Sequence, residues 1–184
     1  MQIDVAQQID IDEMVALDVL VSGSSRRGNL ITQTVKQHHG YVARQQTQIV
    51  GFLLMHQHFF ELPFIELLIV HPSFRCQGIG TALMQHIETI STPGKLFTST
   101  NLSNERMQRL CERLGYVRSG IIENLDEDDP ELFYFKRLSI DGPFRERLDK
   151  WKLLRCQVGE PVLSKCRECF LCVAHLFSSF FQKK

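Results

Sequence analysis

The distribution of apolar residues along the chain predicts an alternation of strands and helices up to about residue 138. Runs rich in β-branched, aromatic and other apolar residues predict strands at residues 2–6, 41–44, 49–58, 64–70, 96–100, 116–122 and 132–138. Apolar residues that recur every three or four positions predict helices that start near residue 10, at 29–38, at 79–90 and between Asn104 and Gly115. The expected order is strand, two helices, three strands, helix, strand, helix and two strands.

The segment from Phe64 to Leu83 combines a strand, a loop and a helix. Residues 64–70 are almost continuously apolar, which predicts a strand buried on both faces, and His71-Pro72 ends it because proline cannot donate to a sheet ladder. A loop with Gly78 and Gly80 then leads into the helix at 79–90. Backbone N–H groups in such a loop and at a helix N-terminus favour an anion, most often a phosphate.

The glycine spacing indicates which kind of phosphate loop this is. A Walker loop is excluded because Gly80 is followed by Thr81-Ala82, and a Rossmann loop is excluded because Leu83 stands at the position of its third glycine. The remaining pattern, Arg75-x-x-Gly78-x-Gly80, resembles the acetyl-CoA pyrophosphate loop of the GNAT superfamily of N-acetyltransferases. A tight turn that needs glycine is the alternative, but it does not account for the order of the surrounding elements.

A second motif supports the resemblance. Asn104, followed by the run from Leu110 to Tyr116 (LCERLGY), is similar to a helix of the same family. The resemblance covers residues 1–138 and implies the GNAT fold, an α/β (α+β) domain with a mixed, mostly antiparallel central sheet flanked by helices. Residues 139–184 lie outside it and are expected to form a helical C-terminal extension.

The resemblance also implies a binding site for acetyl-CoA as the acyl donor. The backbone amides of the loop would bind the pyrophosphate, and an arginine would add positive charge nearby. Backbone at the end of the central strand would pair with the pantetheine amides, and an asparagine would contact the pantetheine arm. The residues at these positions are Gln77, Gly78, Gly80 and Thr81 in the loop, Arg75, the strand residues Ile69 and Val70, and Asn104.

Two residues are candidates for proton transfer. Glu66 is the one charged residue in the apolar strand, and burial there would raise its pKa toward the range of a general base. Some relatives carry a catalytic glutamate at this position; a buried carboxylate held by hydrogen bonds is the equal alternative. Cys111 stands where many relatives have a tyrosine that protonates the departing CoA thiolate. A thiol could serve, but Cys111 is also on the apolar face of its helix, which favours a core position.

No metal site is expected. His56, His58 and His71 have no carboxylate or cysteine spaced with them as zinc ligands. In the C-terminal segment, Cys166, Cys169, Cys172 and His175 recur at intervals of three, so on a helix each would be rotated by about 60° from the one before. They could not converge on one ion while helical.

Charge and composition limit the class of partner. The 21 basic and 21 acidic residues give a net charge of zero, which is not the signature of a nucleic-acid-binding protein. The acidic run from Glu123 to Glu131 is interpreted as a solvated loop. If it is functional, its negative charge would attract a cationic acceptor. The N-terminus lacks a signal peptide and no apolar run is long enough to span a membrane, so a cytoplasmic location is expected.

The apolar run from Leu163 to Phe181 is interpreted as an amphipathic helix. It would pack on the domain, on a partner such as a second copy or, less favoured, on a membrane surface. The sequence thus predicts an acetyltransferase that moves acetyl from acetyl-CoA to a primary amine of a small molecule or protein by direct transfer in a ternary complex. The alternative is a CoA-binding regulatory or interaction protein that has lost the chemistry.

Overall fold

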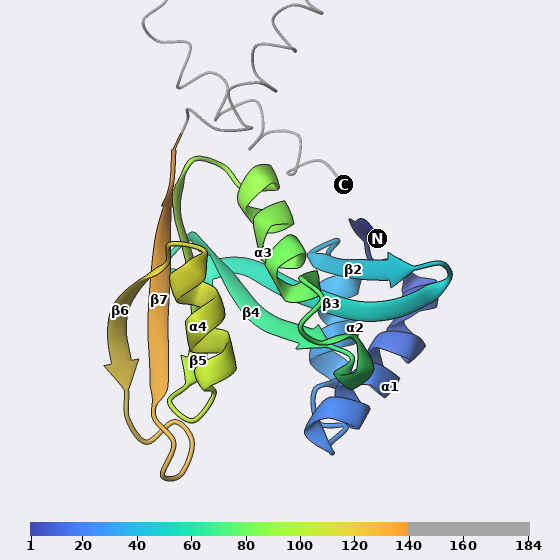
Figure 1. Ribbon diagram of the computed structural model, residues 1–184, viewed down its shortest axis with the longest axis horizontal. Helices are drawn as coiled ribbons and strands as arrows, with labels where there is room; N and C mark the ends of the chain where they lie inside the picture. The colour runs from blue at the N-terminus through green and yellow to red at the C-terminus, as the bar shows by residue number, and fades with distance from the viewer. Residues whose placement is uncertain (140–184) are drawn as a thin grey trace, which may run out of the picture. The chain divides into compact units, whose positions relative to one another are not determined.

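The structure is a computed structural model, and it describes residues 1–139 (Figure 1). These residues form seven strands, four α-helices and two short 3-10 helices. The strands are β1 (Gln2–Val5), β2 (Gly40–Gln45), β3 (Gln48–Phe59), β4 (Leu62–Val70), β5 (Gly94–Asn101), β6 (Val117–Ile122) and β7 (Glu131–Leu138). The helices are η1 (Gln8–Asp10), α1 (Ile11–Ser22), α2 (Gly28–Lys36), η2 (Pro72–Phe74), α3 (Ile79–Ile90) and α4 (Glu105–Arg113).

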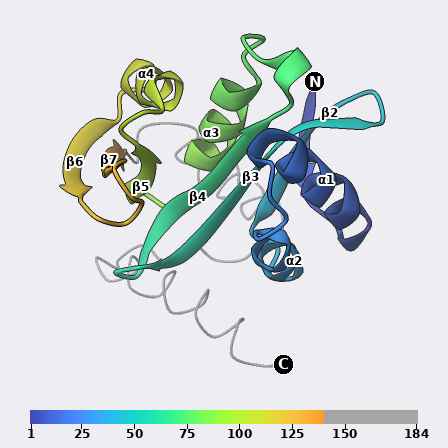
Figure 2. The ribbon, with the colours of Figure 1, turned by 90° about the horizontal axis from the view of Figure 1, so that it is seen from below.

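All seven strands belong to one sheet in the order β1-β2-β3-β4-β5-β7-β6. Every neighbouring pair is antiparallel except β4 and β5, which are parallel and joined by a crossover through α3. Helices α3 and α4 lie on one side of the sheet and α1 and α2 on the other (Figure 2). The order of elements, the sheet type and the fold class expected from the sequence are therefore confirmed, with element ends shifted by one or two residues.

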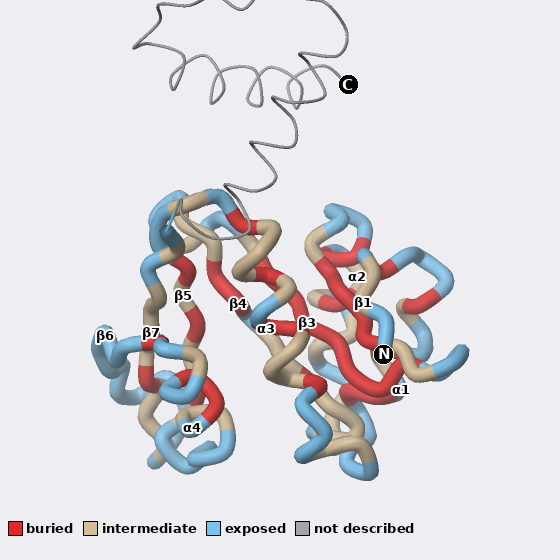
Figure 3. Tube along the Cα trace, turned by 45° about the horizontal axis from the view of Figure 1, so that its top comes forward, coloured by how far each residue is buried: buried red, intermediate tan, exposed pale blue. Residues whose placement is uncertain are grey.

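Strand β3 carries the core on both of its faces. It is buried from Ile49 to Met55, the red stretch of β3 in Figure 3. Phe52 and Leu54 pack with Met14 of α1 on one face, whereas Leu53 packs with Leu83 of α3 on the other. Each such fully buried side chain contributes on the order of 1.5–3 kcal/mol relative to exposure. This burial fixes the two helical layers against the middle of the sheet.

Strands β4 and β5 separate soon after they meet. They pair only at Phe64↔Phe97 and Ile65↔Thr98. From Leu67 to Val70, β4 pairs with β3 but has no strand partner on the side of β5 among the described residues, and Glu66 lies at a register shift between β3 and β4. The prediction of a strand buried on both faces holds in part for this half of β4: Leu68 and Val70 pack toward α3 and Ile69 packs toward α1 and α2, whereas Glu66 is exposed.

The predicted extension lies outside the described residues. The boundary after Leu138, the apolar run 163–181 and its cysteines therefore stay predictions. Among the helices of residues 1–139, none is long and apolar enough to cross a membrane.

Candidate functional site

A large cleft opens where β4 and β5 diverge. Its volume is about 1430 Å³, above the roughly 300–1,000 Å³ of an ordinary ligand pocket, so it has room for an extended ligand and a second molecule. Residues from β4, β5, β7, α3, α4 and the connection between α1 and α2 line it. The sequence motif accounts for only part of this wall.

The loop before α3 ends in a left-handed residue. Gly78 is the N-cap of α3 with φ of +81°, a conformation that glycine adopts without steric cost, and a Cβ placed there would meet no atom within 4 Å. No side chain caps α3, so the N–H groups of Ile79, Gly80 and Thr81 lack partners within the helix. These free donors form the positive end of the helix dipole, which favours an anion.

Gly80 has a different role from Gly78. A Cβ at Gly80 would lie 3.4 Å from Leu110 Cδ2 and 3.6 Å from Leu68 Cδ2. The absence of a side chain therefore lets the first turn of α3 pack closely against β4 and α4. Gly78, Gly80 and Thr81 all line the cleft. The open space above Gly78 and the uncapped amides fit a pyrophosphate group, so the loop suits the donor predicted from the sequence.

The unpaired edge of β4 forms a second part of the donor site. Ile69 and Val70 line the cleft, and within residues 1–139 their β5-facing side has no ladder partner. Backbone amides exposed in this way can pair with the amides of an extended ligand, as a further strand would. The Arg75 side chain also lines the cleft, and its Nε donates to the Val70 carbonyl at 3.4 Å, which places its positive charge beside the strand end.

The two remaining donor-site candidates differ in position. Asn104 lines the cleft as the N-cap of α4, where its Oδ1 accepts from the Met107 N–H at 3.2 Å. The Gln77 side chain donates to the Ser73 carbonyl at 3.4 Å, and Gln77 is not part of the cleft wall. Only the backbone amide of Gln77 was expected to contact the ligand, and that expectation stays a prediction.

Helix α4 adds positive charge that the motif did not indicate. Three of its arginines line the cleft: Arg106, Arg109 and Arg113. Arg109 forms an exposed ion pair with Glu105 at 2.9 Å, one turn away. The spacing of the three arginines is visible in the sequence. The sequence does not show, however, that this face of α4 borders the phosphate loop.

Glu66 faces the cleft and is exposed. The expectation that it is buried is wrong: Glu66 lies at a register shift between β3 and β4, and the pairing of β4 with β5 ends one residue earlier, at Ile65. The Glu66 carboxylate acts on His56 of β3: burial lowers the pKa of His56, and Glu66 opposes that shift. Glu66 is therefore an accessible carboxylate at the point where the cleft begins, which suits contact with an amine.

Glu131 is a second carboxylate in the cleft, and sequence reasoning missed it as a candidate base. It stands at the start of β7, opposite Asn101 of β5. Partial burial raises its pKa, a hydrogen bond from Ser99 opposes this, and the nearby charges of Asp126 and Asp129 raise the pKa further. In the sequence it is the last of a run of acids, which gave no reason to single it out.

Cys111 lies in the core and not in the cleft wall. It is fully buried among the residues under α3 and α4, and burial raises the pKa of its thiol to about 12. This placement supports the core interpretation and contradicts the expectation of a proton donor at the cleft.

The candidate histidines have local structural contacts. His71 Nδ1 accepts from the Ser73 N–H at 3.2 Å, and His56 Nδ1 accepts from the His58 N–H at 3.1 Å. His56 also stacks on the Phe64 ring, with centroids 5.3 Å apart. Within residues 1–139, no group of three or more His, Cys, Asp or Glu side chains is arranged to hold a metal ion.

Comparisons with known proteins agree with this geometry. Residues 15–116 match the acetyltransferase (GNAT) family, whereas no curated protein matches the chain. A GNAT-family acetyltransferase from Bacillus cereus is 35% identical over 75% of this chain and 97% of its own, with a TM-score of 0.72.

Two more distant structures share the fold. An aminoglycoside 6′-N-acetyltransferase complexed with coenzyme A is 17% identical over 76% of this chain and 98% of its own, with a TM-score of 0.65. The protein yncA from Salmonella typhimurium, solved with its cofactor acetyl-CoA, is 12% identical over 76% of this chain and 94% of its own, with a TM-score of 0.64.

Proposed function

Because the chain belongs to the GNAT acetyltransferase family, we propose that it transfers the acetyl group of acetyl-CoA directly to a primary amine in a ternary complex. One observation carries this proposal: the uncapped start of α3 and the unpaired edge of β4 line the same cleft. The first offers donors to a pyrophosphate and the second offers amides to a pantetheine arm. Both structures solved with coenzyme A or acetyl-CoA, cited above, have this fold.

The donor would be held by backbone and by arginines. The amides of Gly80 and Thr81 bind the pyrophosphate, and Arg75 supplies positive charge beside it. Ile69 and Val70 pair with the pantetheine amides. The thioester would then lie near the point where β4 and β5 diverge, which is where Glu66 faces the cleft.

The acceptor must lose a proton before it reacts, because an ammonium group has no lone pair with which to attack the thioester carbonyl. Glu66 is the proposed proton acceptor, acting directly or through a water molecule, and Glu131 is its rival in the same cleft. The CoA thiolate that leaves can be protonated by solvent, so the burial of Cys111 does not prevent transfer.

An assay of acetyl-CoA consumption against a panel of amines tests the proposal. Release of the free thiol together with an acetylated amine, identified by mass, is the expected result. The control is the Gly80→Asp variant, in which the donor cannot bind. If the protein binds acetyl-CoA but acetylates no amine, the regulatory or interaction alternative replaces the enzyme.

A further inference from the structure

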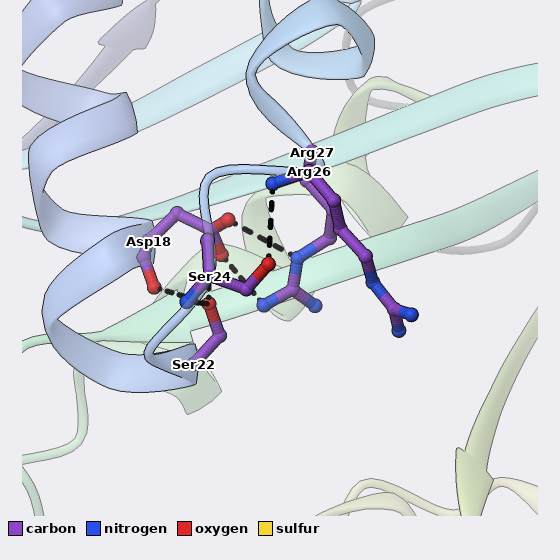
Figure 4. Close-up of polar contacts among 5 residues, drawn as sticks. All are labelled: Asp18, Ser22, Ser24, Arg26 and Arg27. Atoms are coloured by element: carbon purple, nitrogen blue, oxygen red, sulfur yellow. Dashed lines mark hydrogen bonds and ion pairs between the residues drawn. The ribbon is translucent and has the colours of Figure 1, made fainter.

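The connection between α1 and α2 is a compact loop held by its own hydrogen bonds (Figure 4). Ser22 Oγ donates to the Asp18 carbonyl at 2.8 Å, and the Ser24 N–H donates to Ser22 Oγ at 3.2 Å. The Arg26 N–H donates to Ser24 Oγ at 3.3 Å. These contacts fix the backbone that carries two consecutive arginines.

The two arginines of this loop have opposite surroundings. Arg27 binds the buried Asp18 carboxylate with two nitrogens, Nε to Oδ2 at 3.1 Å and Nη2 to Oδ1 at 2.8 Å. The Asp18 side chain is 1% exposed, so this pair is rigid and its charges cancel. Arg27 therefore anchors the loop and leaves little net charge of its own.

Arg26 keeps its charge. Its side chain is exposed and points away from the Asp18 cluster in Figure 4. No ion pair to its guanidinium is found among residues 1–139. Arg26 lines the large cleft that also contains Glu66. A guanidinium held on a fixed loop without a partner is suited to bind the oxygens of a carboxylate or phosphate.

A small hollow beside Arg26 extends this feature. Its volume is about 280 Å³, and it is lined by Ser22, Ser24, Arg26 and Arg27. Three of these residues, Ser22, Arg26 and Arg27, also line the large cleft, so the hollow adjoins it. Its wall has two hydroxyls, the guanidinium of Arg26 and the guanidinium that Arg27 shares with Asp18. The charge of Arg26 therefore makes the hollow complementary to an anion.

We propose that the acceptor carries an anionic group, a carboxylate or a phosphate, that binds Arg26 in this hollow while its primary amine lies at Glu66. This specificity rests on the proposed acetyl transfer. Arg26 acts on the acceptor and not on the donor, because the donor phosphates have their own partners at the start of α3 and on α4. A molecule with an amine at one end and an anionic group at the other can interact with Glu66 and Arg26 at the same time.

Matched acceptors test the proposal. Straight-chain ω-amino acids of increasing length are compared with their carboxamides, and aminoalkyl phosphates with the corresponding amino alcohols. The anionic member of a pair is expected to have a kcat/KM at least about tenfold higher, since bidentate guanidinium contacts are charge-assisted. The two series separate a carboxylate from a phosphate, and the best chain length reports the span between Arg26 and Glu66.

Arg26 variants assign the preference to this residue. Arg26→Ala should raise KM for the anionic acceptor by about 10–100-fold, leave the neutral acceptor unchanged and keep the acetyl-CoA affinity. Arg26→Lys should restore part of the preference. Arg118→Ala is the matched control, because Arg118 is exposed on β6 and does not line the cleft. An equal loss for charged and neutral acceptors, or a loss confined to acetyl-CoA affinity, would overturn the proposal.

A binding experiment separates this inference from the proposed reaction. An N-acetylated ω-amino acid and its carboxamide are titrated by calorimetry into the full chain in the presence of CoA. Binding of the acid that Arg26→Ala weakens at least about tenfold supports the anion site even if no amine is acetylated. Acetylation without any preference for the anionic acceptor, together with equal binding of acid and carboxamide, supports the reaction and overturns the anion site.

Discussion

The two halves of the cleft are built from different parts of the polypeptide. The donor half consists mainly of backbone, the uncapped amides at the start of α3 and the free edge of β4. The acceptor half consists of side chains, Glu66 of β4, Glu131 of β7 and Arg26 of the loop between α1 and α2. The donor half depends on where backbone groups are left without hydrogen-bond partners. The acceptor half depends on which side chains the fold brings together.

This difference separates what is common to the family from what belongs to this protein. Backbone amides are the same in every sequence. A donor site made of them is therefore preserved as long as the glycines and the open strand edge are present. An acceptor site made of side chains changes with each substitution. We therefore expect variants of the donor half to abolish binding of the common ligand, and variants of the acceptor half to change rate or substrate choice.

The most damaging effect, loss of the ligand on which every turnover depends, is expected at Gly78. In Gly78→Asp a Cβ enters a position with φ of +81°, and a carboxylate stands where the pyrophosphate binds. Acetyl-CoA affinity measured by calorimetry should fall on the order of 100-fold or more, because like charges repel in a site formed for an anion. Gly120→Asp is the control, since a Cβ at Gly120 in β6 meets no atom within 4 Å. Unchanged affinity in a folded Gly78→Asp protein would contradict the donor assignment.

The next effect concerns the two carboxylates of the acceptor half. If Glu66 accepts the proton, Glu66→Gln should lower kcat by about 10²–10⁴-fold and leave the acetyl-CoA affinity unchanged. Glu131→Gln is the matched variant. A carboxyl with a raised pKa, as at Glu131, is deprotonated only above that value, so a rate that depends on Glu131 should rise with pH through the raised pKa.

A full pH–rate profile of both variants assigns the base. Loss of the ascending limb in Glu131→Gln but not in Glu66→Gln would transfer the role to Glu131. Rates near wild type in both variants would show that the proton leaves to solvent or to a histidine.

A smaller effect is expected at Cys111, and on stability alone. Cys111→Ser places a hydroxyl in a fully buried apolar site and should lower the free energy of unfolding by about 1–3 kcal/mol. Cys111→Ala should cost less, since only a small cavity forms. Denaturant melts measure the loss, and kcat should stay near wild type in both. A drop in kcat of tenfold or more in a folded variant would restore the thiol as a proton donor.

The smallest effect is expected from removing residues 139–184. All residues assigned to the donor site lie before Leu138, so truncation after Leu138 should change acetyl-CoA affinity by no more than about twofold. The apolar run 163–181 suggests instead that assembly or stability changes. Gel filtration and thermal melts of both lengths, with and without acetyl-CoA, check this. Loss of binding in a folded truncated protein would place the domain boundary further along the chain.

The sequence alone determined the loop and the helix start of the donor half because their signals are local, whereas the free edge of β4 depends on where β5 departs. The apolar run to Val70, the proline that ends it, the glycines and the helical period of 79–90 lie within 30 consecutive residues, and the structure arranges them as their own preferences dictate. The N-cap at Asn104 is local in the same sense.

The acceptor half was decided by the tertiary structure. Glu66 looked buried because its neighbours are apolar, but it is exposed at a register shift between β3 and β4, next to the point where β5 departs. Glu131 became a cleft residue through its pairing with β5, and Arg26 through a loop anchored by Asp18. These residues are far apart in the sequence, and no local preference encodes which side chains the sheet and helices bring to one cleft.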